Sequence, residues 1–210
     1  MQLTNLKTNF LGRNFIYYSE IDSTQDELWR RIEEQNIENG TLVMADIQTK
    51  GKGTHGRIWH TDESKNIAFS FYIQTNCKQE KLEGITVEIA QILIEVLKEK
   101  YNISLSIKAP NDIIYNGKKL GGILTESKMI SEEVRFLVIG IGLNTEKTTF
   151  TDDIKNIATS IKKEFGISID RTEIIASFCN KFEEILKRRI DGWKIIGICL
   201  AKYPILFQLD

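Results

Sequence analysis

Cysteine and long apolar runs are scarce in this sequence, and each shortage argues against a class of protein. The 3 cysteines, Cys77, Cys179 and Cys199, lie far apart and form no CxxC pair. A disulfide framework or zinc knuckle is therefore not expected, and the pattern is consistent with a reducing compartment. We interpret the cysteines as small, partly buried apolar residues. The longest apolar runs, around residues 136–143 and 195–201, are too short to span a bilayer, and the N-terminus does not read as a signal peptide. We expect a cytoplasmic protein with no membrane partner.

An excess of charge of one sign is also absent. The chain has 28 lysines and arginines against 29 aspartates and glutamates, a net charge of -1 and a pI near 6.2. Binding of nucleic acid through a broad electrostatic footprint is therefore not expected, and DNA is not a predicted partner, although local basic clusters can still bind phosphate. The 210 residues contain only 2 prolines and no low-complexity tract. This length suits one domain with a full core, or one domain plus a small appendage.

Short segments rich in branched and aromatic residues occur along the chain, with amphipathic segments between some of them. We predict strands at residues 15–19, 41–47, 66–74, 103–108, 112–115, 118–126 and 133–142. We predict helices at residues 25–34, 83–100 and 171–189. Apolar positions nearly surround the second helix, which predicts a buried helix on a sheet. Asn116 and Gly117 predict a tight hairpin turn, because both tolerate positive φ. Some neighbouring strands are joined by hairpins, and helices lie between only some of the others. This pattern indicates an α+β fold, in which a mixed β-sheet packs against helices.

The most informative local pattern is the glycine-rich basic loop at residues 50–57. It matches GxGxxG, but a strand is expected after it and not the helix that a dinucleotide fold or a P-loop requires. A protein-kinase flap shares the strand–loop–strand setting, yet the chain has no HRD or DFG motif. Glycines let backbone N–H groups approach an anion, and Lys50, Lys52 and Arg57 add cationic donors. We interpret the loop as an anion-binding flap of an enzyme that handles a nucleotide phosphate, with a solvated, flexible loop as the alternative.

Both histidines of the chain, His55 and His60, flank this loop. A metal site would need a third ligand, and no HExxH motif or cysteine lies nearby. Contact between His55 and a substrate therefore fits the sequence better than metal binding by the pair.

Four further segments accompany the loop in a fixed order. These four segments are residues 22–25 (DSTQ), 108–112 (KAPND), 118–124 (KKLGGIL) and 140–144 (GIGLN). The fifth motif is the loop with its flanking residues, 48–59 (QTKGKGTHGRIW). Together they resemble the catalytic domain of biotin–protein ligases over residues 15–190. The resemblance implies a class II synthetase-like biotin/lipoate ligase fold at residues 1–191. It also implies that biotin and Mg·ATP react to biotinyl-5′-AMP and pyrophosphate, and that biotin then passes to a lysine of a biotin carboxyl carrier domain of a biotin-dependent carboxylase.

The resemblance also implies roles for residues at matching positions. For biotin these are Ser23, Thr24, Gln25, Gln48, Gly51, Lys52, Gly53, His55, Gly121 and Gly122. For ATP or the adenylate they are Arg57, Trp59, Asn111, Lys119 and Asn144. Lys119 and Arg57 would be catalytic, because both steps develop negative charge around the α-phosphate. Asp112 would orient Mg2+ or simply brace its loop, and an ordinary hairpin surface lysine is the alternative for Lys119.

The sequence departs from the family pattern in two motifs. The usual flap has the form GRGRxGRxW, whereas here it is GKGTHGRIW, so Lys52 and Thr54 stand in place of arginines. Lysine keeps the charge but loses the bidentate fork, and threonine loses the charge. Ala109 replaces the usual tryptophan of KWPND, which removes a large packing group from the pocket.

Both ends of the chain bear on the expected domain organisation. The few residues before the first predicted strand leave no room for a winged-helix domain, so we expect the monofunctional type without a DNA-binding domain. Family members usually carry an SH3-like barrel after the catalytic domain, and residues 192–210 are too few to build one. We expect a remnant or a truncated segment there. The family often forms homodimers through the face near the flap, which makes a homodimer an expectation here.

Two other functions fit many of the same residues. A lipoate–protein ligase shares the fold, the adenylate and the lysine, but the glycine-rich flap and the PND motif favour biotin. A non-catalytic biotin-binding module is suggested only by the substitutions at Thr54 and Ala109. The retained Lys119, Arg57, Asn111 and Asn144 argue against it.

The altered flap generates a prediction about retention of the intermediate. Thr54→Arg restores a cationic fork where the family usually has one, so we expect it to slow the release of biotinyl-5′-AMP relative to the wild type. Stopped-flow or filter-binding measurement of the off-rate checks this. An unchanged off-rate would show that position 54 does not hold the adenylate.

Overall fold

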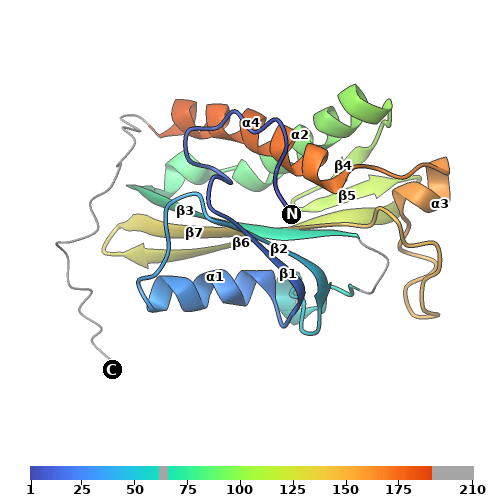
Figure 1. Cartoon of the computed structure of the whole chain (residues 1–210), viewed down its shortest axis with the longest axis horizontal. Coiled ribbons are helices and arrows are strands. Elements are labelled where there is room, and N and C mark those ends of the chain that lie inside the picture. The colour runs from blue at the N-terminus through green and yellow to red at the C-terminus, as the bar shows by residue number, and fades with distance from the viewer. Residues whose placement is uncertain (62–65, 191–210) are drawn as a thin grey trace.

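A mixed sheet forms the middle layer of the protein, and helices cover both of its faces (Figure 1). The computed structural model describes residues 1–61 and 66–190. The strands are β1 (Phe15–Ile21), β2 (Leu42–Gln48), β3 (Ile67–Lys78), β4 (Ser106–Lys108), β5 (Asp112–Tyr115), β6 (Lys118–Ile130) and β7 (Glu133–Leu143). The helices are α1 (Thr24–Glu33), α2 (Ile85–Tyr101), α3 (Ile161–Phe165) and α4 (Arg171–Arg189), with short 3-10 turns η1 (Thr54–Gly56) and η2 (Gln79–Leu82). The expected C-terminal segment at residues 192–210, with Cys199, lies outside the described residues.

The sheet has the strand order β1-β2-β3-β7-β6-β5-β4. β1 runs parallel to β2, and the other neighbouring pairs are antiparallel, which confirms the predicted mixed sheet and α+β class. Asn116 and Gly117 join β5 to β6 with φ angles of 48° and 77°, as the predicted tight turn requires. β3 and β6 run well beyond the predicted ends, whereas β4 is shorter than predicted. α3 and η2 were not predicted, because one or two turns carry too little periodicity to be recognised.

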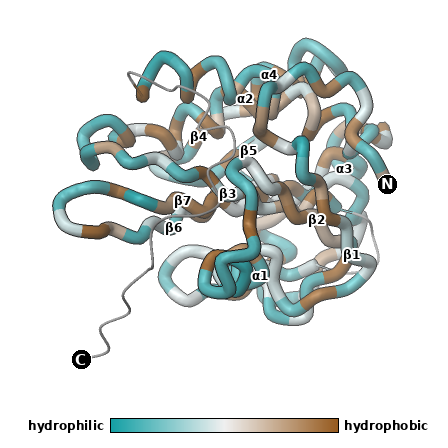
Figure 2. The backbone as a smooth tube through the Cα atoms, turned by 60° about the vertical axis from the view of Figure 1, so that its left-hand side comes forward, coloured by the Kyte–Doolittle hydropathy of each residue, from teal (hydrophilic) through white to brown (hydrophobic). Residues whose placement is uncertain are grey.

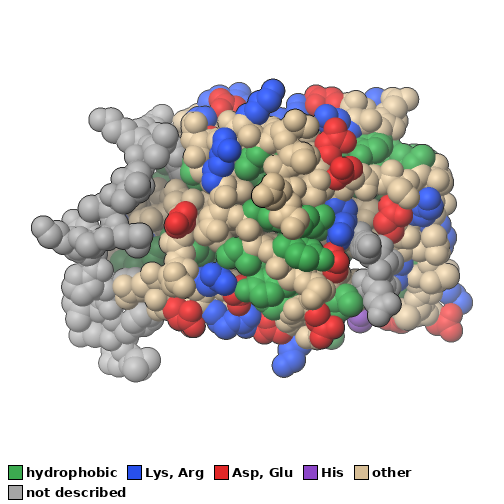
Figure 3. All heavy atoms as spheres, in the orientation of Figure 1, with side chains coloured by type: hydrophobic (Ala, Val, Ile, Leu, Met, Phe, Trp, Pro, Cys, Tyr) green, Lys and Arg blue, Asp and Glu red, His purple; other side chains and the backbone are tan. Residues whose placement is uncertain are grey.

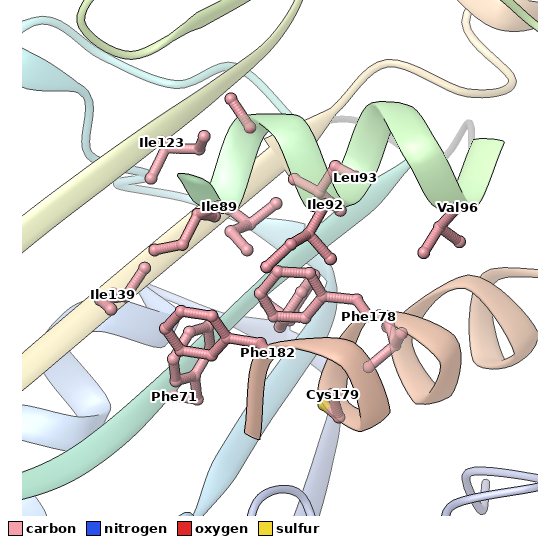
Figure 4. Close-up of a cluster of buried hydrophobic side chains, with 14 of the residues drawn as sticks. Phe71, Ile89, Ile92, Leu93, Val96, Ile123, Ile139, Phe178, Cys179 and Phe182 are labelled. Atoms are coloured by element: carbon pink, nitrogen blue, oxygen red, sulfur yellow. The ribbon is translucent and has the colours of Figure 1, made fainter. Parts of the chain in front are cut away.

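The main core lies between the sheet and the pair α2 and α4, where hydrophobic positions gather on the inward sides of the elements (Figure 2). Phe71 of β3 meets Phe178 and Phe182 of α4, with ring centroids 5.7 and 5.4 Å apart (Figure 4). The buried faces of α2 supply Ile89 and Leu93 to the same cluster. Aromatic rings in such tilted contacts add to the stabilisation from burial.

α2 packs on the sheet as expected, but the prediction that it is buried nearly all round is wrong. Gln91, Glu95 and Lys98 form an exposed stripe, because the helix belongs to an outer layer and only one side of it meets the core. Cys77 and Cys179 are buried and free, as the sequence suggested. Burial raises the pKa of the Cys179 thiol, so it stays protonated and inert.

The opposite face of the sheet carries α1 and a smaller apolar cluster. Leu28 and Ile32, the positions at helical spacing, are buried against Val43, Tyr72 and Val138. This cluster fills only part of the face. The rest of this face, next to the first turn of α1, is not covered by the helix and carries the candidate site.

Charges of both signs are interspersed on the face drawn in Figure 3, as the balanced composition leads one to expect. None of the helices in the described part of the chain combines the length and the apolar character that crossing a bilayer would require.

A buried carboxylate ties the N-terminal segment to α4. Glu183 is 1% exposed and accepts hydrogen bonds from the backbone N–H groups of Asn9 (2.7 Å), Phe10 (3.1 Å) and Leu11 (3.1 Å). Lys187 lies 3.2 Å from the same carboxylate. Burial by itself would raise the pKa of Glu183, but the backbone donors outweigh it and hold the pKa below its usual range.

This arrangement predicts a stability loss that depends on pH. Glu183→Gln puts an amide N–H against backbone donors, so we expect a loss of about 1–3 kcal/mol in the free energy of unfolding at pH 7. The folded-state pKa is lowered, so the contribution of the carboxylate is present above its unfolded pKa of about 4.3 and is lost as the pH falls through the folded value. Urea denaturation of both proteins from pH 7 downward should therefore show the difference shrinking in acid. Glu184→Gln, at the exposed neighbouring position, is the control. A stability difference between Glu183→Gln and the wild type that does not change with pH would contradict the role assigned to the Glu183 carboxylate.

Candidate functional site

Small residues leave one area of the α1 face of the sheet open. In the strand register Gly122 lies opposite Gly142, which lies opposite Ala68, and in the next row Gly140 lies opposite Ser70. A Cβ atom at Gly142 would come within 2.3 Å of the Trp59 ring, and one at Gly140 within 2.7 Å of the Gln25 Oε1 atom. Glycine at these two positions is therefore what lets neighbouring groups lie directly on the strands.

Two adjoining cavities open above this floor. The inner cavity lies between the floor, the start of α1 and the flap, and the predicted residues that line it are Thr24, Gln25, Gln48, Lys52, Gly53, Trp59, Asn111, Lys119 and Gly122. The outer cavity lies on the other side of the flap, and its predicted residues are Gly53, Arg57, Trp59, Lys119 and Asn144. Gly53, Trp59 and Lys119 belong to both. The structure therefore brings most of the predicted biotin and ATP residues together from five separate segments of the chain.

A chain of hydrogen bonds fixes the polar wall of the inner cavity. The Gln48 side-chain oxygen accepts from the Thr24 backbone N–H (2.8 Å) and from the Thr24 hydroxyl (3.0 Å). The Thr24 hydroxyl is also 2.8 Å from that of Ser70. Because Thr24 gives its only hydroxyl proton to Gln48, Ser70 is the donor in that contact. The amide nitrogen of Gln48 then remains on the side of Gly51, as a donor.

The DSTQ segment is held by the start of α1. Ser23 is the N-cap residue, and its side chain accepts from the Asp26 backbone N–H. Arg30 binds both oxygens of Asp22 at 2.8 and 2.9 Å, and this pairing is the main cause that lowers the pKa of Asp22 to about 2. The backbone N–H of Lys50 donates to the Asp22 carbonyl oxygen, so this turn also anchors the beginning of the flap.

The flap folds as a short hairpin over the glycine floor. Trp59 N–H donates to the Gly51 carbonyl (2.8 Å), Gly53 N–H donates to the Arg57 carbonyl (2.7 Å), and η1 forms the tip. The ammonium group of Lys52 pairs with the Asp26 carboxylate at the start of α1. This ion pair ties the flap to the helix across the inner cavity.

Lys119 stands in the wall shared by the two cavities. Its Nζ atom is 2.6 Å from the Asp112 carboxylate and 5.8 Å from the centre of the Trp59 ring. Its backbone is held by residues 157–159, because Lys119 N–H donates to the Ile157 carbonyl (2.7 Å) and the Thr159 N–H donates to the Lys119 carbonyl (2.8 Å). Lys119 is therefore held at the boundary of the two cavities by its backbone contacts and by Asp112.

The outer cavity combines apolar walls with basic residues. Ile58, Phe150, Ile154 and Ile157 supply apolar surface, and Lys147 adds positive charge. The predicted residues here already have protein partners: the Arg57 guanidinium donates to the Thr54 hydroxyl at 2.9 Å. The Asn144 amide donates to the Thr159 carbonyl at 3.1 Å. Asn111, on the inner side, donates to the Ile123 carbonyl at 3.2 Å.

Several predicted residues do not line either cavity. Ser23 is fully buried as a helix cap, and His55, at the tip of the flap, is exposed. Gly51 is buried with its Cα facing the Trp59 carbonyl. Gly121 points to the core side, against Leu143, because neighbouring residues of a strand face opposite sides of the sheet.

Some lining residues were missed in the sequence. Gly140 lines the inner cavity, and its alternation with Gly142 in the GIGLN motif was the available signal. Ser70, a polar residue within an apolar strand, was a second signal. Nothing in the sequence connects Phe150 or Ile157 with the flap, because only the path of the chain after β7 brings them there.

No group of three or more His, Cys, Asp or Glu side chains able to hold a metal ion occurs within residues 1–61 and 66–190. Asp112 is thus a single carboxylate, already facing the Lys119 ammonium. A fully protein-bound metal centre is not formed by these residues.

Comparison with known proteins agrees with this geometry. Residues 17–144 match the model of the Biotin/lipoate A/B protein ligase family. The bifunctional ligase/repressor BirA of Bacillus subtilis is 36% identical over 181 residues, which are 85% of this chain and 55% of that protein. The chain therefore spans about half the length of this curated relative.

Solved structures give the same result. The biotin protein ligase of Aquifex aeolicus, in complex with biotin and ATP, is 31% identical and superposes with a TM-score of 0.70 over 86% of this chain and 73% of that one. The enzyme of Leishmania major, in complex with biotinyl-5-AMP, is 26% identical with a TM-score of 0.63 over 94% and 87% of the two chains. The family match, covering more than half of the chain, together with these likenesses, shows that this chain belongs to the biotin/lipoate A/B protein ligase family.

Proposed function

We propose that this protein activates biotin with ATP to biotinyl-5′-AMP and transfers biotin to a specific lysine of a biotin carboxyl carrier domain. The observation that carries the proposal is the position of Lys119 in the wall common to the inner cavity, which has one polar wall, and the outer cavity, which combines apolar walls with basic residues. Such a wall suits a reaction that joins a carboxylate in one cavity to a nucleotide phosphate in the other. The relative from Aquifex aeolicus binds biotin and ATP, which supports the choice of substrates.

The proposed first step is attack of a biotin carboxylate oxygen on the α-phosphorus of ATP. A bond forms between that oxygen and phosphorus, the bond to the β-phosphate oxygen breaks, and pyrophosphate leaves with the electron pair. Negative charge accumulates on the α-phosphate oxygens, and the Lys119 ammonium is positioned to stabilise it. Arg57 would leave Thr54 to bind phosphate, since its present partners there, a hydroxyl and a backbone carbonyl, are both neutral.

In the proposed second step the amine of an acceptor lysine attacks the carbonyl carbon of the mixed anhydride. An amide bond forms, the bond from the carbonyl carbon to the phosphate oxygen breaks, and AMP leaves. The amine loses one proton during the step, and that proton passes to solvent water. The cations that serve the first step also stabilise the leaving phosphate.

The remaining roles follow from the two cavities. Thr24, Gln25 and Gln48 would bind the polar head of biotin, and Gly122 with the flap residues Lys52 and Gly53 would enclose its chain. Trp59 would lie beside adenine in the outer cavity, with Asn111 and Asn144 at its polar edges. Ser23, Gly51 and Gly121 would act through the backbone that they shape, and His55 would require movement of the flap tip to reach a substrate.

Mg2+ would accompany ATP and neutralise phosphate charge. It binds few protein carboxylates when phosphate oxygens and water complete its shell, so a single carboxylate such as Asp112 fits this mode. Asp112 would then exchange part of its contact with Lys119 for the ion.

A biotin carboxyl carrier domain is the proposed acceptor, because a relative from Mycobacterium tuberculosis is named as a biotin–acetyl-CoA-carboxylase ligase. A homodimer is a second proposed contact. β1 is an edge strand of the sheet, and its Tyr17 is half-exposed. Hydrophobic side chains also gather in the middle of the face drawn in Figure 3.

The catalytic role of Lys119 gives a direct prediction. Lys119→Ala should lower the rate of biotin-dependent pyrophosphate release by about 100-fold or more, because a fixed charge at the transferred phosphate is removed. The assay uses labelled biotin, ATP and a candidate carrier domain, and follows both pyrophosphate and labelled carrier. Lys118→Ala, at the neighbouring hairpin position, is the matched control and should stay near the wild-type rate. Folded wild-type protein that releases no pyrophosphate would favour a non-catalytic binder.

The choice between biotin and lipoate can be checked without a carrier. Biotin should raise the melting temperature of the wild-type chain, and lipoate at the same concentration should raise it much less, because the ligand that binds the folded state more tightly stabilises it more. Thermal-shift titration with each ligand, with and without ATP, measures this. A shift with lipoate alone would overturn the choice of biotin in favour of a lipoate–protein ligase.

A further inference from the structure

Gln25 is a buried amide with one satisfied end and one unsatisfied end. The side chain is 2% exposed. Its nitrogen Nε2 donates to the Glu126 carboxylate and to the Val138 carbonyl, both at 3.1 Å. Its oxygen Oε1 has no hydrogen-bond partner. A buried carbonyl oxygen without a donor lowers the stability of the folded protein, because its desolvation is not compensated by a hydrogen bond.

The orientation of this amide is fixed by its neighbours. Both groups that face Nε2 are acceptors, so the reversed amide would set an oxygen against a carboxylate and a carbonyl. The same Glu126 oxygen also accepts from the Trp29 indole N–H at 2.7 Å. Glu126 is therefore held on one side by Trp29 and holds Gln25 on the other.

The unsatisfied oxygen lies on the glycine floor of the inner cavity. A Cβ atom at Gly140 would be 2.7 Å from Oε1, and Gln25 and Gly140 both line that cavity. A ligand in the cavity that carries an N–H donor would supply the missing partner.

Gln48 offers the complementary group in the same cavity. Its oxygen is occupied by two donors from Thr24, which leaves the amide nitrogen as the group available to a ligand. The inner cavity thus presents an acceptor from Gln25 and a donor from Gln48. A cyclic urea has N–H donors and a carbonyl acceptor, whereas a dithiolane ring has no N–H group to offer.

We propose that Glu126 is a positioning residue that fixes the Gln25 amide with its oxygen toward the cavity, and that this selects ligand heads with an N–H donor. The inference deepens the proposed function: it rests on biotin as the substrate and names what distinguishes a ureido ring from a dithiolane ring. Glu126 acts through Gln25 and has no contact with the substrate itself.

The experiment measures biotin affinity by calorimetry on the full chain and its variants. Gln25→Met and Glu126→Met should each weaken biotin binding by about 10-fold to 100-fold, because the N–H acceptor is removed or turned away. Glu126→Gln should retain affinity within about 3-fold, because one amide oxygen can replace the carboxylate oxygen that accepts both N–H donors. Trp29→Phe, which removes only the other donor to that oxygen, is the matched control and should also retain it.

A double-mutant cycle separates positioning from loss of folding. In the Gln25→Met background, Glu126→Met should weaken biotin binding by less than about 3-fold more, since the group that it positions is already gone. A biotin analogue methylated on the ureido nitrogens should bind the wild type as weakly as biotin binds Gln25→Met. Melting temperatures of all variants are recorded alongside.

The outcomes are distinguishable. If the wild type binds no biotin, the proposed function fails and this inference fails with it. If the wild type binds biotin but Gln25→Met or Glu126→Met binds it equally well, the inference fails and the proposed function stands. Additive losses in the cycle would also overturn positioning, because they would mean that Glu126 acts independently of Gln25.

Discussion

The pairing of β6 with β7 in a single register is the constraint on which the site depends. Gly122 and Gly142 face each other, and both point to the α1 side of the sheet. A slip of β6 by one residue would turn Gly122 into the core and set Gly121 on the site face, because side chains alternate along a strand. The large core on the other face, built on Phe71, Phe178 and Phe182, opposes such a slip. Packing on one side of the sheet thus determines where the open area lies on the other.

The flap and the Lys119 hairpin approach this open area from different parts of the chain. Trp59 lies on Gly142, and Lys119 lies beside Trp59 and Gly122. The segment after β7 then closes on the backbone of Lys119 through residues 157–159. One restrained lysine is therefore shared by the inner and the outer cavity. Fixed cations at the boundary of two cavities need little rearrangement when charge develops there.

The two residues that replace arginines in the flap, Lys52 and Thr54, each have a partner in the structure. Lys52, where arginine is usual, pairs with Asp26 of α1, and Thr54 accepts a hydrogen bond from Arg57. A lysine provides one compact charge, and an ion pair between partly exposed groups is weak. The flap is therefore tied to α1 by a contact that a phosphate can replace. The Ala109 substitution has no comparable counterpart that the structure explains.

The sequence by itself determined the class of the fold, most of the strands and helices, and the residues of the main motifs. Hydrophobic periodicity, the Asn116–Gly117 turn and the ordered motifs are local signals, and they survive folding unchanged. Tertiary structure alone decided which residues of those motifs face the cavities: Gly122 but not Gly121, and Gln25 with its oxygen inward. It also decided that Phe150 and Ile157 form the outer cavity, and that Glu126 holds Gln25. These facts depend on strand register and on contacts between residues far apart in the chain, and neither is encoded in the spacing of neighbouring residues.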